Sequence, residues 1–241
     1  MSPARSSVTA IILSASALLA VAGLHLSASG QAVDMKEHFT RIVTIQQAVI
    51  RGDLEDVREP ARWLAEHQTT GDVASPSAAL LTNMRSVAKR ASDAKTLPAA
   101  AGDAAALVAT CGNCHAALSV RPKLPPVPDV PAGATGTAEH MLEHQHAVDQ
   151  MYQGLVGPSD DQWMKGAKEL TASPLARNDL PRDPALTNDI AAAEARTHQL
   201  AEKALQTKDM NGRAAIYGEI IAGCGQCHGL HGRVWGPGVP K

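Results

Sequence analysis

The sequence carries one five-residue pattern twice, and much of the chain repeats around it. Residues 111–115 read Cys-Gly-Asn-Cys-His, and residues 224–228 read Cys-Gly-Gln-Cys-His, an offset of 113 residues. Further upstream, residues 35–38 (Met-Lys-Glu-His) match residues 141–144 (Met-Leu-Glu-His) at an offset of 106. Self-similarity at this scale predicts two copies of one folding unit, with seven extra residues in the second copy.

A proline-rich stretch separates the two copies. Residues 122–131 read Pro-Lys-Leu-Pro-Pro-Val-Pro-Asp-Val-Pro, which is typical of a semi-rigid linker and unsuited to a helix. We therefore predict a first domain over 33–118, a linker over 119–137 and a second domain over 138–241. The seven extra residues are expected near the prolines of the segment 174–184.

Composition and periodicity predict an all-α fold. Aromatic residues make up only 2% of the chain, whereas strands favour aromatic and β-branched residues. Each copy shows four segments with apolar residues at helical spacing, separated by glycine and proline. Four amphipathic helices with short turns predict a four-helix bundle, so the chain is expected to form two bundles in tandem. The expected helices cover 34–51, 53–67, 77–96 and 100–116 in the first copy, and 138–156, 159–173, 184–207 and 210–229 in the second.

The first residues have the pattern of a secretory leader. Arg5 precedes an apolar run over residues 8–26, and small residues follow it. We predict a signal peptide over 1–32 that is cleaved, and hence an exported, periplasmic protein; the alternative is an uncleaved anchor. No other segment is expected to cross a membrane. The net charge of −2 gives no indication of nucleic-acid binding.

The repeated pattern is C-x-x-C-H, the attachment signature for c-type haem. Two thiols add to the two vinyl groups of the porphyrin, and the histidine then reaches the iron. On a helix the positions i, i+3 and i+4 share one face, so all three side chains point to the same side. We predict two haem c groups, with thioether bonds from Cys111, Cys114, Cys224 and Cys227 and proximal iron ligands from His115 and His228.

Three other interpretations of the cysteines fit less well. A redox C-x-x-C site is expected beside a strand–helix–strand pattern, which the sequence lacks. A zinc site requires two C-x-x-C pairs about 15–20 residues apart, whereas these are a domain apart. Structural disulfides, the usual fate of cysteines in exported proteins, leave the two histidines unexplained.

The sixth iron position is expected to be filled from the first helix of each copy. Positions 35, 38, 42, 45 and 49, and likewise 141, 144, 148, 151 and 155, form an apolar stripe that includes a histidine. His38 and His144 are the predicted distal ligands, and Met35 and Met141, one turn earlier, are the alternatives. A hydrogen-bonded core histidine is the simpler interpretation. The remaining histidines without a counterpart in the other copy are expected to be surface or structural residues: His67, His140, His146 and His198.

Each copy resembles the class II, cytochrome c′ type of bundle, with C-x-x-C-H on the last helix and the distal side formed by helix one. The resemblance covers about 34–118 and 138–230 and implies the thioether and proximal roles given above. A covalently held haem in a rigid bundle, with both axial sites filled, can change its oxidation state with little rearrangement, so we predict an electron carrier, not an enzyme, that exchanges electrons with a redox partner protein. Two alternatives stay open, namely binding of NO or CO at an open haem iron, and a dihaem peroxidase-type enzyme.

Overall fold

The structure is a computed structural model that describes residues 35–67, 77–172, 175 and 184–235. Every regular element in these ranges is a helix, which confirms the predicted all-α class. The predicted leader and most of the predicted insertion lie outside the described residues. A helix over residues 35–51 comes first, and is followed by α2 (Glu55–Glu66), α3 (Ser77–Asp93), α4 (Leu97–Ala117), α5 (Gly136–Val156), α6 (Asp160–Leu170), α7 (Pro184–Gln206) and α8 (Met210–Trp235).

The repeat in the sequence reappears in the helix boundaries. Helices α3 and α7 end at Asp93 and Gln206, and α4 and α8 begin at Leu97 and Met210. The two helix ends are 113 residues apart, and so are the two helix starts, which is the offset between the two C-x-x-C-H motifs. Equivalent residues in these four helices can therefore be compared position by position.

Local capping explains where the boundaries depart from the sequence prediction. The α4 helix begins at Leu97, three residues earlier than expected, because the Thr96 hydroxyl accepts a hydrogen bond from the Ala99 amide at 3.4 Å. Pro98 then lies in the first turn, where its missing N–H is not needed, so it starts the helix instead of breaking it. The α2 helix begins at Glu55, two residues late, because the Asp53 carboxylate accepts from the two following helix amides at 3.2 Å.

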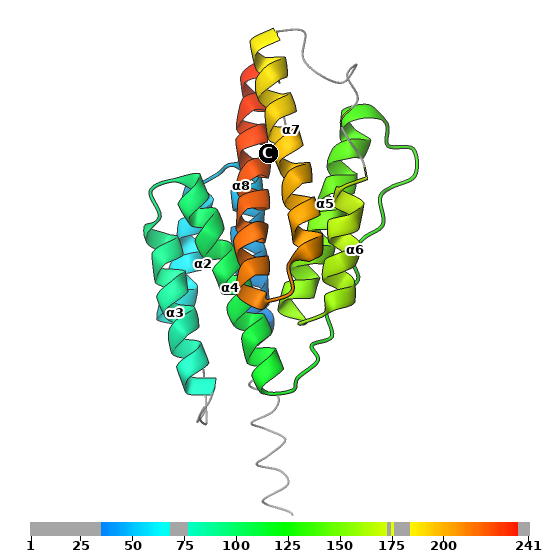
Figure 1. Cartoon of the computed structure of the whole chain (residues 1–241). Helices are drawn as coiled ribbons and strands as arrows, with labels where there is room; N and C mark the ends of the chain where they lie inside the picture. Colours follow the sequence, from blue (N-terminus) through cyan, green and yellow to red (C-terminus); the bar gives the residue numbers. More distant parts are fainter. Residues whose placement is uncertain (1–34, 68–76, 173–174, 176–183, 236–241) are drawn as a thin grey trace, which may run out of the picture.

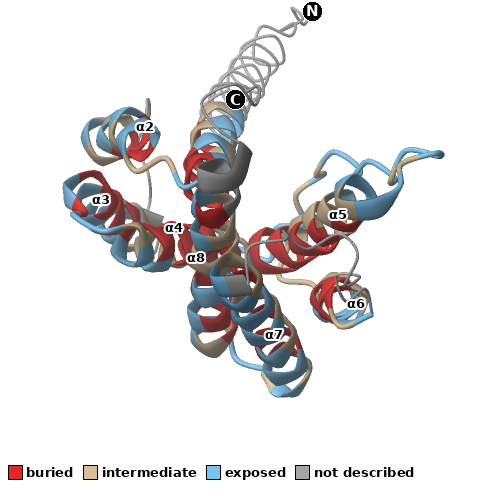
Figure 2. Cartoon of the chain, turned by 90° about the horizontal axis from the view of Figure 1, so that it is seen from above, coloured by how far each residue is buried: buried red, intermediate tan, exposed pale blue. Residues whose placement is uncertain are grey.

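Helices α4 and α8 lie side by side in the middle of the molecule, with α2 and α3 on one side and α5, α6 and α7 on the other (Figures 1 and 2). Small residues allow this close approach: a Cβ added to Gly218 of α8 would lie 3.1 Å from the Cα of Gly102 in α4. The buried apolar side chains of both copies form one continuous core. Among the described helices, none combines the length and the apolarity needed to cross a bilayer.

Each motif-bearing helix packs against the first helix of the other copy. A Cβ added to Gly112, inside the first motif, would lie 2.1 Å from the carbonyl oxygen of Leu155 in α5. A Cβ added to Gly225, inside the second motif, would lie 2.3 Å from the carbonyl oxygen of Val49 in the helix over 35–51. Val49 and Leu155 are equivalent at the offset of 106, so the two contacts are reciprocal.

The proline-rich stretch has no regular secondary structure and runs beside α5. The side-chain amide of Gln153 donates to the carbonyl of Pro125 at 2.5 Å, and Nδ1 of His146 lies 2.8 Å from the carbonyl oxygen of Pro128. These contacts attach the segment to the second copy along its length.

Candidate cofactor site

Both C-x-x-C-H motifs lie on helices, in the last turns of α4 and in the C-terminal half of α8. The pattern of exposure is the same in both: the glycine is buried, the third residue is exposed, and the two cysteines and the histidine are half-buried. All four cysteines are free thiols. The helical spacing therefore presents two thiols and an imidazole at the edge of the core in each copy, as the sequence predicts.

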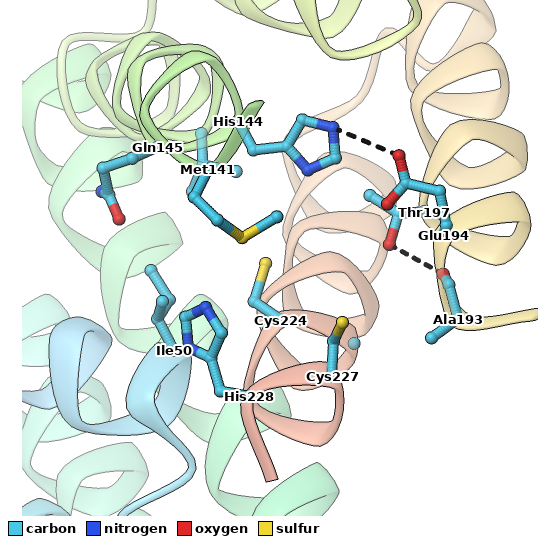
Figure 3. A pocket seen from close by; sticks show the side chains of 12 residues that line it. Ile50, Met141, His144, Gln145, Ala193, Glu194, Thr197, Cys224, Cys227 and His228 are labelled. Atoms are coloured by element: carbon cyan, nitrogen blue, oxygen red, sulfur yellow. Dashed lines mark hydrogen bonds and ion pairs between the residues drawn. The ribbon is translucent and has the colours of Figure 1, made fainter. Parts of the chain in front are cut away.

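A cavity that is partly open to solvent lies directly against the second motif (Figure 3). Cys224, Cys227 and His228 line it from α8, and Met141 and His144 line it from α5. The structure thus brings the thiols, the predicted proximal histidine and both distal candidates of the second copy to one cavity. The rest of the lining is Ile50, Gln145, Val148, Ala193, Glu194, Thr197 and Gly223.

The two distal candidates of the second copy point in different directions. Figure 3 shows the Met141 side chain reaching into the cavity towards Cys224, while the His144 ring is turned towards Glu194 on α7. The Nε2 atom of His144 lies 3.8 Å from Oε1 of Glu194. Both side chains border the cavity, but only the thioether is directed at its centre.

Burial keeps the motif thiols protonated. It raises the pKa of Cys111 and of Cys224 from 9.0 to about 12, with the neighbouring cysteine of each motif adding to the effect. Burial also raises the pKa of Cys227 to about 11, and the Glu194 carboxylate adds to the rise. In the haem-free chain these groups are therefore neutral at physiological pH, which makes them poor nucleophiles and poor ligands for a free metal ion.

The imidazole of the first motif is oriented by the second copy. Nδ1 of His115 donates to the carbonyl oxygen of Val156, at the end of α5, at 2.7 Å. Histidines that bind a metal through one ring nitrogen commonly donate the other to a carbonyl or carboxylate, which fixes the ring. The equivalent of Val156 is Ile50, and Ile50 borders the cavity together with His228.

In the first copy the two distal candidates differ in burial. His38 is 3% exposed, whereas Met35 is 43% exposed. The His38 ring makes edge-on contacts with Trp63 and His67, at 5.7 and 5.6 Å between ring centroids, and those two rings stack on each other at 4.0 Å. Of the two candidates, His38 is therefore the one on the buried face of its helix.

Sequence reasoning missed a polar cluster beside the cavity. It contains His140 on α5 and His198 on α7, which were both expected to be surface or structural residues. The Nε2 atom of each lies at a distance of 3.0 Å from Oε1 of Glu194. Burial by itself raises the pKa of Glu194, but His140, His144 and His198 outweigh it and lower the pKa to about 2. The missing signal was the spacing of four residues within each helix, Glu194 to His198 and His140 to His144, which places each pair on one face.

Comparisons with known proteins add no assignment for this site. The chain matches no protein-family model, no curated protein and no solved structure.

Proposed function

We propose that this protein is an exported dihaem c-type cytochrome that carries electrons between redox partners. The observation that carries the proposal is the recurrence of C-x-x-C-H at equivalent places of a helical repeat, with free thiols in both copies. Every cysteine of the chain belongs to one of these motifs. A single motif could arise by chance, whereas two in equivalent helices that use all the cysteines are specific for haem attachment.

The residues around the second cavity fit a covalently held haem. Two thiols and an imidazole border it from α8, and an imidazole and a thioether border it from α5, so residues of both helices could hold the group. Bound there, haem c would supply an iron that changes its charge by one electron. Ile50 and Val148 give the cavity apolar walls, and such walls limit solvent access and thereby tune the reduction potential.

In the first copy the same roles fall to the equivalent residues. Cys111 and Cys114 would form the thioether bonds, and His115, held by the Val156 carbonyl, would be the proximal ligand. His38 is the preferred distal ligand because it is buried, with Met35 as the alternative. In the second copy His228 is the proximal ligand, and His144 and Met141 are the distal candidates.

The architecture supports a two-centre carrier. We infer two cytochrome c′-like four-helix bundles joined by the proline-rich segment, and the reciprocal glycine contacts hold their motif helices in one core. A rigid helical frame changes little when an electron arrives, which suits electron transfer better than catalysis. The predicted leader over 1–32 supports export to the periplasm, where a redox partner protein would dock at one of the half-exposed motifs.

The test is a count of covalently bound haem in the purified full chain. After acid–acetone extraction, the pyridine haemochrome assay should give two haems per chain. Replacing both cysteines of one motif by alanine should remove one haem, whichever motif is chosen. Reduced spectra that do not respond to CO support electron transfer; a CO-responsive haem would favour gas binding, and an absence of covalent haem would overturn the proposal.

A further inference from the structure

We propose that His140, His144 and Glu194, with His198 as a fourth ligand, form a binding site for a divalent transition-metal ion such as Zn²⁺ between α5 and α7. The cluster borders the same cavity as Cys224 and Cys227 but includes none of the residues of the C-x-x-C-H motif. It does not depend on the proposed function, although it bears on which residue faces the haem in the second copy.

The geometry is that of a metal site in a helical bundle. Two ligands lie one turn apart on α5, and two more lie one turn apart on the facing helix α7, an arrangement by which bundles bind metals. One ligating atom each from His140, His144 and Glu194 lies within 4.8 Å of the others. The ring centroids of His140 and His144 are 4.0 Å apart, and those of His144 and His198 are 5.7 Å apart.

The chemistry of the donors selects the kind of ion. Imidazole nitrogen with one carboxylate oxygen suits zinc and its neighbours in the first transition series, whereas calcium and magnesium prefer oxygen ligands. The side chains of His140 and Glu194 are only 7% and 14% exposed. The cluster therefore offers a carboxylate oxygen and imidazole nitrogens side by side in a partly buried position.

A comparison of the two copies indicates that the cluster has a function that the first copy lacks. At the offset of 113, Leu81 occupies the position of Glu194, and Arg85 occupies the position of His198. The first copy therefore has a C-x-x-C-H motif and a first-helix histidine, but its described residues contain no such cluster. Even if the first copy attaches haem as proposed, it would do so with the shared residues alone, so haem attachment would not account for the additional ligands of the second copy.

The cation site also has a consequence for the proposed cytochrome. With His144 held by the cation, Met141 is the remaining distal candidate of the second cavity, and Figure 3 shows its thioether directed there. The first copy would keep His38. The two copies would then differ in axial ligation.

The experiment is equilibrium dialysis of the purified full chain, first against a chelator and then against Zn²⁺ alone, followed by elemental analysis. We expect one zinc per chain, with haem iron counted separately. Glu194→Gln and His140→Asn should each lower the affinity by at least about tenfold. His146→Asn, a change on the same helix outside the cluster, should bind as the unaltered chain does.

Circular dichroism and haem content report whether each variant is folded. If Glu194→Gln proves unstable, His198→Asn provides the same comparison from the edge of the cluster. Absence of zinc in the unaltered chain, or equal zinc in the cluster variants and in His146→Asn, would overturn the proposal. A chain that binds zinc but contains no covalent haem would overturn the proposed function and leave the cation site standing.

Discussion

The imidazole of His115 donates through Nδ1 to the backbone carbonyl of Val156 at 2.7 Å, although the two residues belong to different copies of the repeat. The contact requires the end of α4 to lie against the end of α5. Gly112 permits this approach, since any larger residue there would meet the Leu155 carbonyl. The orientation of a predicted iron ligand in one copy thus depends on packing against the other.

Gly112→Ala should therefore destabilise the chain. The new methyl group would lie 2.1 Å from the Leu155 oxygen, and a backbone atom cannot move aside as a flexible side chain can. We expect a loss of about 1–3 kcal/mol in the free energy of unfolding, measured by urea denaturation. Gly102→Ala, on the exposed side of the same helix with no atom within 4 Å of the new Cβ, should be neutral or stabilising. Equal effects of the two changes would contradict the packing argument.

The burial of His38 predicts which residue completes the first haem site. His38→Ala should convert one of the two haems from low spin to high spin and make it responsive to CO. Met35→Leu, at a position 43% exposed, should leave the spectrum unchanged. Absorption and electron paramagnetic resonance spectra of the two variants decide the matter. The opposite pattern would assign the ligand to Met35.

The orientation of Met141 predicts a different ligand in the second copy. Met141→Leu should convert the second haem to high spin, whereas His144→Ala should lower zinc affinity and leave the spectrum intact. A methionine ligand raises the reduction potential relative to a second histidine, so the two haems of the unaltered chain should titrate at separate potentials. A single potential together with a spectral change in His144→Ala would show that His144 binds the iron.

The raised pKa of the motif thiols predicts that the haem-free chain loses stability at alkaline pH. The folded state keeps the Cys224 proton up to about pH 12, whereas the unfolded chain releases it from about pH 9. Between these values the folded state binds more protons, so the free energy of unfolding falls as pH rises. Cys224→Ala should reduce this slope in denaturation experiments under reducing conditions. The haem-loaded protein should lack this contribution, because a thioether has no proton to release.

The sequence predicted the helices well because their apolar spacing and their glycine and proline breaks are local signals. It failed at Pro98, where the Thr96 cap turns an expected break into a helix start. The second motif and both distal candidates of that copy border one cavity, and their roles there stay predictions. The motif residues share a helix face, and the distal candidates occupy equivalent positions of the repeat. Helical spacing and the repeat are both visible in the sequence, so they suffice to group these residues.

Two features could not be predicted from the pattern. His140 and Glu194 are far apart in the sequence and meet only because α5 packs near α7, and a comparison between the copies discards residues that have no counterpart. The reciprocal glycine contacts could not be predicted either. A repeat in the sequence shows which segments are alike, but it does not show whether a segment packs against its own copy or against the other one. Both depend on tertiary packing, for which the sequence carries no periodic signal.

The reciprocal contacts of Gly112 and Gly225 have the form of an isologous interface, in which each partner uses the same surface towards the other. A gene encoding one copy would produce a subunit with that surface uncovered, and pairing with a second identical subunit would cover it. At these two contacts the chain thus has the arrangement that two identical subunits would form about a twofold axis. Within one chain the two copies can differ in sequence, and identical subunits cannot; among the described residues the histidine–glutamate cluster is such a difference, because it occurs in the second copy alone.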